Sequence, residues 1–252
     1  MIEILILSLI QGITEFLPIS SSSHLILFSE IFDYKNQSLS IDVSMHIGSF
    51  IAVIIYFYKD IINFFDNKIL FLKILISSVP IMFIGFFLAE TGLIEKIRNI
   101  KVIAWTTLIF GILLYICDRF KLENSIEKNF TFKSAILIGL FQILSLIPGV
   151  SRSGIAISAA RLLNFKRVDA AKISFLLSIP VLGAVSLFGL KNIILSESVY
   201  FTKVNLISIC FSFIFSFLTI KFFLKYIKKF NLDVFVYYRI LLGLFLMIMI
   251  YL

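Results

Sequence analysis

Long apolar runs separated by short charged segments are the main pattern of this chain. A helix needs about 20 predominantly apolar residues to cross the hydrocarbon core of a bilayer, and several of these runs are near that length. Six of them predict ordinary transmembrane helices. They cover residues 43–58, 70–90, 101–117, 173–190, 204–224 and 234–252.

Two other apolar segments, 2–28 and 134–163, are each broken near the centre by a proline that is followed by serines. Such a segment is either a single kinked crossing or a re-entrant hairpin that enters and leaves on one side. Non-helical backbone at membrane depth survives only where it is buried in protein or lines a wet cavity. Each break is therefore predicted to face a polar site.

The distribution of lysine and arginine decides between the two alternatives for the segment 134–163. If it is re-entrant, the loops on one side of the membrane carry fifteen Lys and Arg residues and those on the other side carry six. That asymmetry is typical of cytoplasmic and external loops, and a single crossing would remove it. The basic loops are 59–73, 118–133, 161–172 and 221–229, and the others are 29–42, 91–101 and 191–203.

The two broken segments resemble each other. Gln11-x6-Pro18-x-Ser20-Ser21 is echoed by a glutamine at 142 that precedes Pro148 and its serines, which predicts repeat halves of about 1–126 and 127–252 within one integral membrane domain. The charge count makes the hairpins enter from opposite sides, as in an inverted repeat with its site at the repeat interface. Re-entrance of the first hairpin rests on this analogy. The predicted fold is an all-α polytopic membrane protein with six transmembrane helices and two re-entrant helical hairpins in inverted-topology repeats.

Composition supports a membrane protein and explains the positive charge. Hydrophobic residues make up 60% of the 252 residues and charged residues only 15%, whereas soluble domains are about half apolar and about a quarter charged. The net charge of +8 comes almost entirely from short loops between apolar segments. We therefore expect the partner to be the bilayer, with its anionic headgroups, and not nucleic acid.

The first break concentrates polar side chains around Pro18. Gln11 and Glu15 are four residues apart and share one face of the entering helix. Pro18 ends that helix, and the serines at 20–23 offer N-cap hydroxyls to a second helix whose first N–H groups form a cradle for an anion. His24 lies in the first turn of that helix. A carboxylate such as Glu15 inside a membrane segment indicates a functional site.

The second break reads Pro-Gly-Val-Ser-Arg-Ser-Gly at 148–154. Pro-Gly forms a turn, and Ser151 can cap the next helix. Arg152 has a planar guanidinium group that can bind a phosphate with two parallel hydrogen bonds. We predict that Arg152 binds phosphate, and an ion pair with Glu15 in the absence of substrate is compatible with that role.

Together the breaks supply a carboxylate, a histidine, hydroxyl groups, an arginine and two helix N-termini, which is the equipment for phosphoryl transfer. A transporter that binds the same anion is the alternative, because broken helices in inverted repeats are also typical of transporters. Glu15 and His24 beside Ser21 favour the enzyme, since anion transport alone does not require them. His46, at the start of the span 43–58, is predicted to support the site or the fold.

The sequences at both breaks resemble motifs of the undecaprenyl-diphosphatase family, whose members are also called the BacA or UppP bacitracin-resistance proteins. The resemblance rests on Glu-Phe-Leu-Pro-Ile-Ser-Ser with His24 and on Pro-Gly-Val-Ser-Arg-Ser-Gly. It extends over nearly the whole chain, including His-Ile-Gly-Ser at 46–49 and Ser-Phe-Leu-Leu-Ser-Ile-Pro at 174–180. The family pattern has Glu or Gln four residues before a Glu, and here the pair is Gln11 and Glu15, which makes Gln11 the weaker candidate for binding a metal.

The resemblance implies hydrolysis of undecaprenyl diphosphate to undecaprenyl phosphate and inorganic phosphate, which recycles the lipid carrier of peptidoglycan synthesis. The transporter alternative then becomes a polyprenyl-phosphate transporter or flippase that uses the same re-entrant anion site. The resemblance also implies dependence on a divalent cation, Mg²⁺ or Ca²⁺, with Glu15 as its candidate ligand. The positions that match the family's catalytic residues are Glu15, Ser21, His24 and Arg152, and those expected to bind substrate are Gln11, Ser20, Ser22, Ser151 and Ser153.

The roles within this set stay open between two mechanisms. In the first, Ser21 is the nucleophile or a donor to the scissile phosphate, and His24 is the general acid and base. Glu15 then binds the metal or orients the attacking group, while Arg152 holds the phosphate. In the second, Glu15 or His24 activates water directly and Ser21 only positions the substrate.

The charge count also predicts location. It places both chain ends and the mouth of the first hairpin outside the cell. We therefore expect a multi-pass protein of the bacterial cytoplasmic (inner) membrane whose active site faces the extracytoplasmic side. A homodimer is left open as a further partner.

Overall fold

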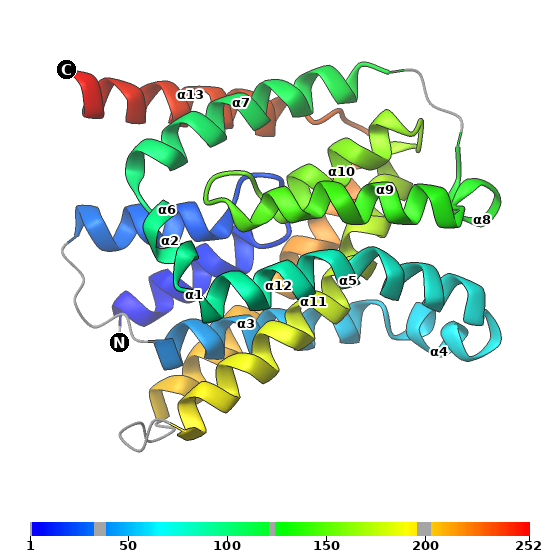
Figure 1. Cartoon of the computed structure of the whole chain (residues 1–252), viewed down its shortest axis with the longest axis horizontal. Helices are drawn as coiled ribbons and strands as arrows, with labels where there is room; N and C mark the ends of the chain where they lie inside the picture. The colour runs from blue at the N-terminus through cyan, green and yellow to red at the C-terminus, as the bar shows by residue number, and fades with distance from the viewer. Residues whose placement is uncertain (1, 33–38, 121–123, 196–202) are drawn as a thin grey trace.

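The computed structural model describes all residues except 1, 33–38, 121–123 and 196–202, and Figure 1 shows the chain. The described residues form helices and no strand, apart from one isolated bridge between Asn124 and Phe165. The helices are α1 (Ile2–Thr14), α2 (Ser21–Ile31), α3 (Leu39–Tyr56), α4 (Tyr58–Asp66), α5 (Lys68–Glu90), α6 (Leu93–Ile97), α7 (Ile100–Asp118), α8 (Ile126–Asn129), α9 (Phe132–Ile143), η1 (Leu144–Leu146), α10 (Arg152–Leu162), α11 (Arg167–Leu195), α12 (Lys203–Ile227) and α13 (Asp233–Tyr251).

The described helices match the six predicted spans. Five of them, α5, α7, α11, α12 and α13, are long and apolar enough to cross a membrane, and α3 with α4 forms a sixth if this pair, bent by 64°, counts as one span. The all-α polytopic membrane fold is thereby confirmed. Two boundaries differ, because the predicted helix 43–58 bends at Phe57 and α11 already begins at Arg167. The first turns of α11 are polar, so a hydropathy pattern misses them although the helix continues through them.

The second broken segment is a hairpin of α9 and α10 whose two ends lie together. Asn124, before α9, forms the isolated bridge with Phe165, after α10. The rings of Phe130 and Phe165 pack edge to face with centroids 6.2 Å apart, and Lys73 donates from Nζ to the carbonyl of Phe130 at 2.5 Å. The chain therefore enters and leaves on the side of the basic loops, as the charge count predicted.

The first broken segment is a hairpin of α1 and α2 that opens at the opposite end of the molecule. Leu7 of α1 packs in one cluster with the beginning of α3 and with Val204 near the beginning of α12. Leu27 of α2 packs with Ile103, near the beginning of α7, and with Leu246, near the end of α13. These contacts lie at the beginnings of α3, α7 and α12, whereas the basic loops follow the ends of the same helices. The two hairpins therefore enter from opposite sides.

Each hairpin packs against a spanning helix from the other half of the chain. Helix α1 contacts α12, and α9 contacts α5, while α7 and α13 lie side by side along one edge of the molecule (Figure 1). Glycines allow the close approach. A Cβ on Gly12 would lie 2.5 Å from Phe215 Cβ, and one on Gly139 would lie 2.4 Å from the carbonyl oxygen of Ser77. Small residues let membrane helices pack backbone to backbone in this way.

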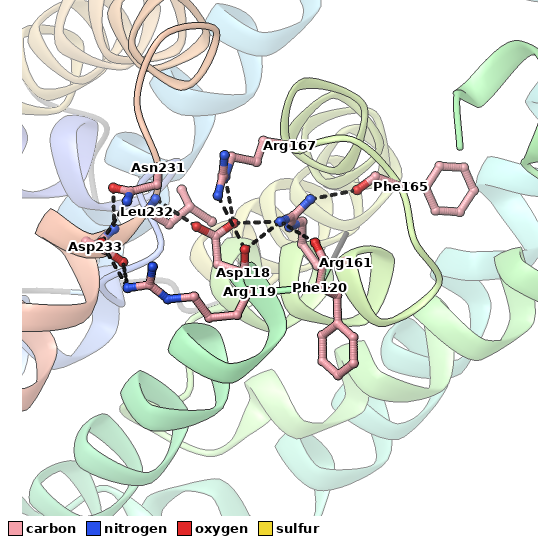
Figure 2. A network of polar contacts seen from close by, with 9 residues as sticks. All are labelled: Asp118, Arg119, Phe120, Arg161, Phe165, Arg167, Asn231, Leu232 and Asp233. Carbon is pink, nitrogen blue, oxygen red and sulfur yellow. Dashed lines mark hydrogen bonds and ion pairs between the residues drawn. The ribbon is translucent and has the colours of Figure 1, made fainter. Parts of the chain in front are cut away.

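A polar network around Asp118 connects several helices on the side of the molecule where the basic loops lie (Figure 2). The carboxylate of Asp118 is 3.0 Å from Arg161 Nη2 and 2.8 Å from Arg167 Nε, and it accepts from the backbone N–H of Leu232 at 3.1 Å. The side chains of Asp118 and Arg161 are 2% and 0% exposed. Asp118 therefore joins the end of α7 to the second hairpin, to α11 and to the beginning of α13.

Replacing Asp118 with asparagine is expected to lower the free energy of unfolding by about 2–3 kcal/mol, because buried Arg161 loses its charged partner while asparagine keeps one acceptor oxygen. The measurement is thermal unfolding of the purified protein in detergent. Asp233→Asn is the matched control, since the charged partner of Asp233 is Arg119, whose side chain is 50% exposed, and the other side-chain contact of Asp233 is with Asn231 at 2.7 Å. An exposed pair contributes less than about 1 kcal/mol, so equal shifts for both variants would contradict the prediction.

Candidate active site

The tips of the two hairpins meet at an ion pair between Glu15 and Arg152. The side chains are 7% and 14% exposed, respectively. A second contact joins the tips where Ser153 Oγ donates to the carbonyl oxygen of Leu17 at 2.7 Å. These two contacts confirm the prediction that the two breaks meet inside the fold.

The first tip keeps Glu15 on the same face as Gln11 although α1 ends one residue earlier. The backbone N–H of Glu15 still donates to the carbonyl of Gln11 at 3.0 Å, and Gln11 Nε2 donates to Glu15 Oε2 at 3.0 Å. The next side chain, Phe16, is buried and packs edge to face on Phe175 with ring centroids 5.4 Å apart. This aromatic contact fixes the direction in which the chain leaves α1.

Serines in the left-handed backbone region begin the second helix of both hairpins. Ser20 has φ 75° and Ser151 has φ 70°, a conformation that is unfavourable for residues other than glycine and is concentrated at functional sites. Ser151 Oγ accepts from the N–H of Gly154 at 3.1 Å, so the predicted cap on α10 is confirmed. The predicted hydroxyl cap on α2 is wrong, because Ser20 Oγ instead bonds Ser23 Oγ at 3.0 Å.

The ion pair borders a cavity of about 190 Å³, the polar cavity. Ser21 Oγ donates to Glu15 Oε2 at 2.6 Å beside it. The polar cavity shares Ser21, Ser22 and His46 with a larger cavity of about 410 Å³, the mouth cavity, which Gln11 also lines. The polar residues around the polar cavity are Thr14, Glu15, Ser20, Ser21, Ser22, His46, Ser145, Ser151 and Arg152.

Comparison with known proteins assigns the chain to a family. A model of the family described as bacitracin resistance protein BacA matches residues 4–245. The chain belongs to the BacA family. It is 51% identical over 251 residues to an undecaprenyl-diphosphatase of Pelagibacter ubique, with 99% of this chain and 98% of that protein covered. It is also 43% identical to one of Saccharophagus degradans, with 94% and 93% covered, and 36% identical to one of a Jannaschia species, with 98% and 97% covered.

Most of the predicted site residues of this BacA-family protein lie at the polar or the mouth cavity. Ser153 is an exception, because its hydroxyl binds the carbonyl of Leu17 and Ser151 Oγ, and it lines neither cavity. Its position joins the two tips. It therefore contributes to the shape of the site and not to its surface.

His24 is turned away from Glu15 and Arg152. Its Nδ1 is 2.6 Å from the carbonyl oxygen of Ser20 and must donate to it, and its Nε2 is 2.5 Å from Tyr238 Oη. The His24 and Tyr238 rings are stacked with centroids 5.6 Å apart. In the neutral ring Nε2 then accepts from the tyrosine hydroxyl. His24 braces the first tip in this structure and lines neither the polar nor the mouth cavity.

His46, which the sequence pattern assigned a supporting role, lines both cavities of this BacA-family site. Gln11 Nε2 donates toward His46 Nδ1 at 3.1 Å as well as to Glu15 Oε2. The imidazole is therefore linked to the carboxylate through a single amide group. The available signal was that His46 is one of only two histidines and lies inside a predicted span.

Arg239 was not predicted and holds both tips at once. The residue is fully buried in α13. Its Nη1 donates to the carbonyl oxygens of Pro18 at 3.1 Å and Val150 at 3.0 Å, and its Nη2 donates to that of Gly149 at 2.8 Å. The first acceptor belongs to the first hairpin and the others to the second. A guanidinium group with a fixed fork of donors suits this arrangement.

The oxygen ligands that the site offers a divalent cation are few. The described residues contain no group of three His, Cys, Asp or Glu side chains that could hold a metal by themselves. Glu15 supplies a carboxylate, and Gln11 Oε1 is buried without a hydrogen-bond partner among the described residues. Mg²⁺ commonly takes one or two protein oxygens and completes its shell with substrate phosphates and water, and this donor set fits such a cation.

Proposed function

We propose that this BacA-family protein is an undecaprenyl-diphosphate phosphatase that releases inorganic phosphate and leaves undecaprenyl phosphate. The observation that carries the proposal is the 2.6 Å hydrogen bond from Ser21 Oγ to Glu15, beside Arg152 in a cavity between membrane helices. A hydroxyl, a base and a phosphate-binding cation are thus in one place. The shared name of the similar proteins supports the same substrate.

The geometry favours Ser21 as the nucleophile. Glu15 Oε2 takes the proton of the Ser21 hydroxyl as the oxygen attacks the terminal phosphorus. The bond from that phosphorus to the bridging oxygen breaks, and the lipid monophosphate leaves with the electron pair and with the proton that Glu15 held, so the carboxylate is restored. Water then attacks the phosphoserine while Glu15 takes its proton, and Glu15 returns that proton to Ser21 Oγ as the bond from phosphorus to Oγ breaks and inorganic phosphate is released. Direct attack by water activated by Glu15 is the rival mechanism, in which Ser21 only positions the phosphate.

Arg152 and the beginning of α2 would bind the negative charge of the substrate. Arg152 exchanges its contact with Glu15 for the phosphate, which also frees the carboxylate to act as a base. The first N–H groups of α2 have no side-chain cap from Ser20, so they can donate to a phosphate oxygen as helix N-termini commonly do. Every one of these groups comes from one chain, and the proposal needs no second copy.

A divalent cation, Mg²⁺ or Ca²⁺, would be held by Glu15, with the Gln11 amide oxygen as the weaker second protein ligand. When bound, such a cation neutralises charge on the diphosphate. Glu15 is then shared between the cation and the proton of Ser21. His24 would keep the first tip in place from the far side of Ser20 rather than contact the phosphate, and its assignment as acid and base requires the ring to turn from Tyr238.

Ser21→Ala is expected to lower kcat for phosphate release from a soluble short-chain prenyl diphosphate by about a hundredfold or more, because the nucleophile is removed. The measurement is inorganic phosphate released by the purified protein. Ser208→Ala is a matched control, since among the described residues Ser208 Oγ donates within its own helix, to the carbonyl of Val204 at 3.0 Å. Acid trapping of a phosphoserine on Ser21 is the direct readout. If Ser21→Ala keeps most of its turnover, the rival water mechanism replaces this one.

The lipid transporter is the second candidate, because the opposed hairpins are also typical of transporters. The enzyme proposal would be overturned if the wild-type protein released no phosphate from any prenyl diphosphate and yet moved a prenyl phosphate between leaflets. We further propose that the site faces the extracytoplasmic side of the inner membrane, and the distribution of fifteen basic residues on one side and six on the other supports this orientation. Sealed right-side-out vesicles should then hydrolyse the impermeant short-chain substrate, and inside-out vesicles should not.

A further inference from the structure

An apolar groove of about 270 Å³ lies between α5 and α11, directly beside the polar cavity. Gly85, which has no side chain, and Ala89, which has only a methyl group, line it from α5, and Phe188 of α11 packs edge to face on Phe86 with ring centroids 5.8 Å apart. We call it the α5–α11 groove. It is lined by apolar residues throughout, in contrast to the serines and charged groups of the neighbouring polar cavity.

The α5–α11 groove and the polar cavity have common walls. Ile81, Leu146, Val181 and Val185 line both of them, and Leu146, Val185 and Phe188 also line the mouth cavity. A molecule whose charged end lies at Glu15 and Arg152 can therefore continue into apolar surroundings without crossing a packed layer.

Two other apolar cavities among the described residues have no wall in common with the polar cavity. One, of about 420 Å³, lies between α1, α12 and α13, and the other, of about 370 Å³, lies between α3, α4, α5 and α11. Neither shares a lining residue with the polar cavity or with the mouth cavity. Ordinary lipid chains can fill them. The second cavity adjoins the α5–α11 groove at Met82 and Ala184, so a molecule whose diphosphate is at the ion pair would reach it through that groove.

We propose that the α5–α11 groove binds the first isoprene units of the prenyl chain while the diphosphate occupies the polar cavity. The inference rests on the proposed function, because it requires a prenyl diphosphate at Glu15 and Arg152. Moving the isoprene units out of water into the groove contributes binding free energy that grows with each buried carbon. Gly85 and Ala89 leave the space for these units, and the Phe86 and Phe188 rings cover them.

Filling the groove should weaken binding of substrates that reach into it. Ala89→Phe and Gly85→Leu are expected to raise KM for a three-isoprene diphosphate on the order of tenfold, about 1.4 kcal/mol, and to raise KM for a one-isoprene diphosphate much less. A Cβ on Gly85 would meet only Leu146 Cδ2, at 3.2 Å, which is the end of a flexible side chain. Ala89 is exposed, so at least this variant should fold.

Thr219→Phe is the matched control, because it adds the same ring to the apolar cavity between α1, α12 and α13. It should leave the ratio of the two KM values as in wild type. The proposal is overturned if both groove variants keep the wild-type ratio, which would mean that ordinary lipid fills the groove, or if Thr219→Phe changes it equally. Failure of the proposed function is a separate result, namely wild-type protein that hydrolyses neither substrate.

Discussion

Replacing Glu15 with glutamine is expected to lower phosphate release from a prenyl diphosphate by about a thousandfold or more. Glu15 Oε2 is the acceptor of the Ser21 hydroxyl at 2.6 Å, and the other carboxylate oxygen pairs with Arg152. Glutamine keeps the size of the side chain but cannot take a proton, and loss of one member of a catalytic unit removes most of its effect. The measurement is kcat for phosphate release by purified protein.

Activity alone would not separate chemistry from folding, because Glu15→Gln also leaves a nearly buried Arg152 without its charged partner. Removing one member of a buried ion pair destabilises a protein by about 3 kcal/mol or more, whereas removing both members is often nearly neutral. The double variant Glu15→Gln with Arg152→Gln should therefore unfold at a higher temperature than either single variant and remain as inactive. A double variant that regains activity, or one whose losses of stability simply add, would contradict this account.

The architecture was predictable because its signals are local or can be counted. Breaks at Pro18 and Pro148 appear in the sequence itself, and the positions of lysine and arginine sort the loops into two sides. The structure brings the basic loops together through contacts such as Lys172 with Asp60 at 2.6 Å and Arg167 with Asp118 at 2.8 Å. The two hairpins therefore open at opposite ends of the molecule, and their tips point toward each other. The contact between Glu15 and Arg152 follows from this topology.

The orientation of side chains at the tips was not predictable in the same way. Whether His24 turns toward Ser21 or away from it depends on Tyr238, which α13 presents from 214 positions further along the chain. The missing hydroxyl cap on α2 has a similar origin, because the Ser20 hydroxyl is already engaged by Ser23. The hydrogen-bond partner that each side chain takes depends on which of several nearby groups is closer. Spacing along the sequence does not contain that information.

The sequence does contain an indication that Arg239 is unusual, and it lies in the positions of the basic residues. Of the 23 lysines and arginines, only Arg152 and Arg239 fall outside the loops between apolar segments. An ionisable residue within a membrane helix indicates function by default. Arg239 lies in the last apolar run, where the distribution of loop charges carries no information about it. Both exceptions contact the hairpin tips.

Replacing Arg239 with methionine is expected to lower the free energy of unfolding by about 4 kcal/mol and to abolish measurable phosphate release. The carbonyls of Pro18, Gly149 and Val150 would be left buried without their donor, and each unpaired buried acceptor is destabilising. Thermal unfolding in detergent and the phosphate assay measure the two effects. A folded and active Arg239→Met protein would show that the tips are held by other contacts.

Arg239→Lys tests whether Arg239 positions the tips or only stabilises the fold. Lysine keeps the charge, but one ammonium group cannot reproduce the fork that reaches carbonyls on both hairpins. If Arg239 sets their register, the coupling energy between Glu15 and Arg152, measured by a double-mutant cycle in the Arg239→Lys background, should shrink together with kcat. Arg119→Lys makes the same substitution at an exposed ion pair and should change neither quantity. A lower unfolding temperature with unchanged coupling would instead assign Arg239 to the fold alone, because a residue that aligns the tips must alter the interaction between them.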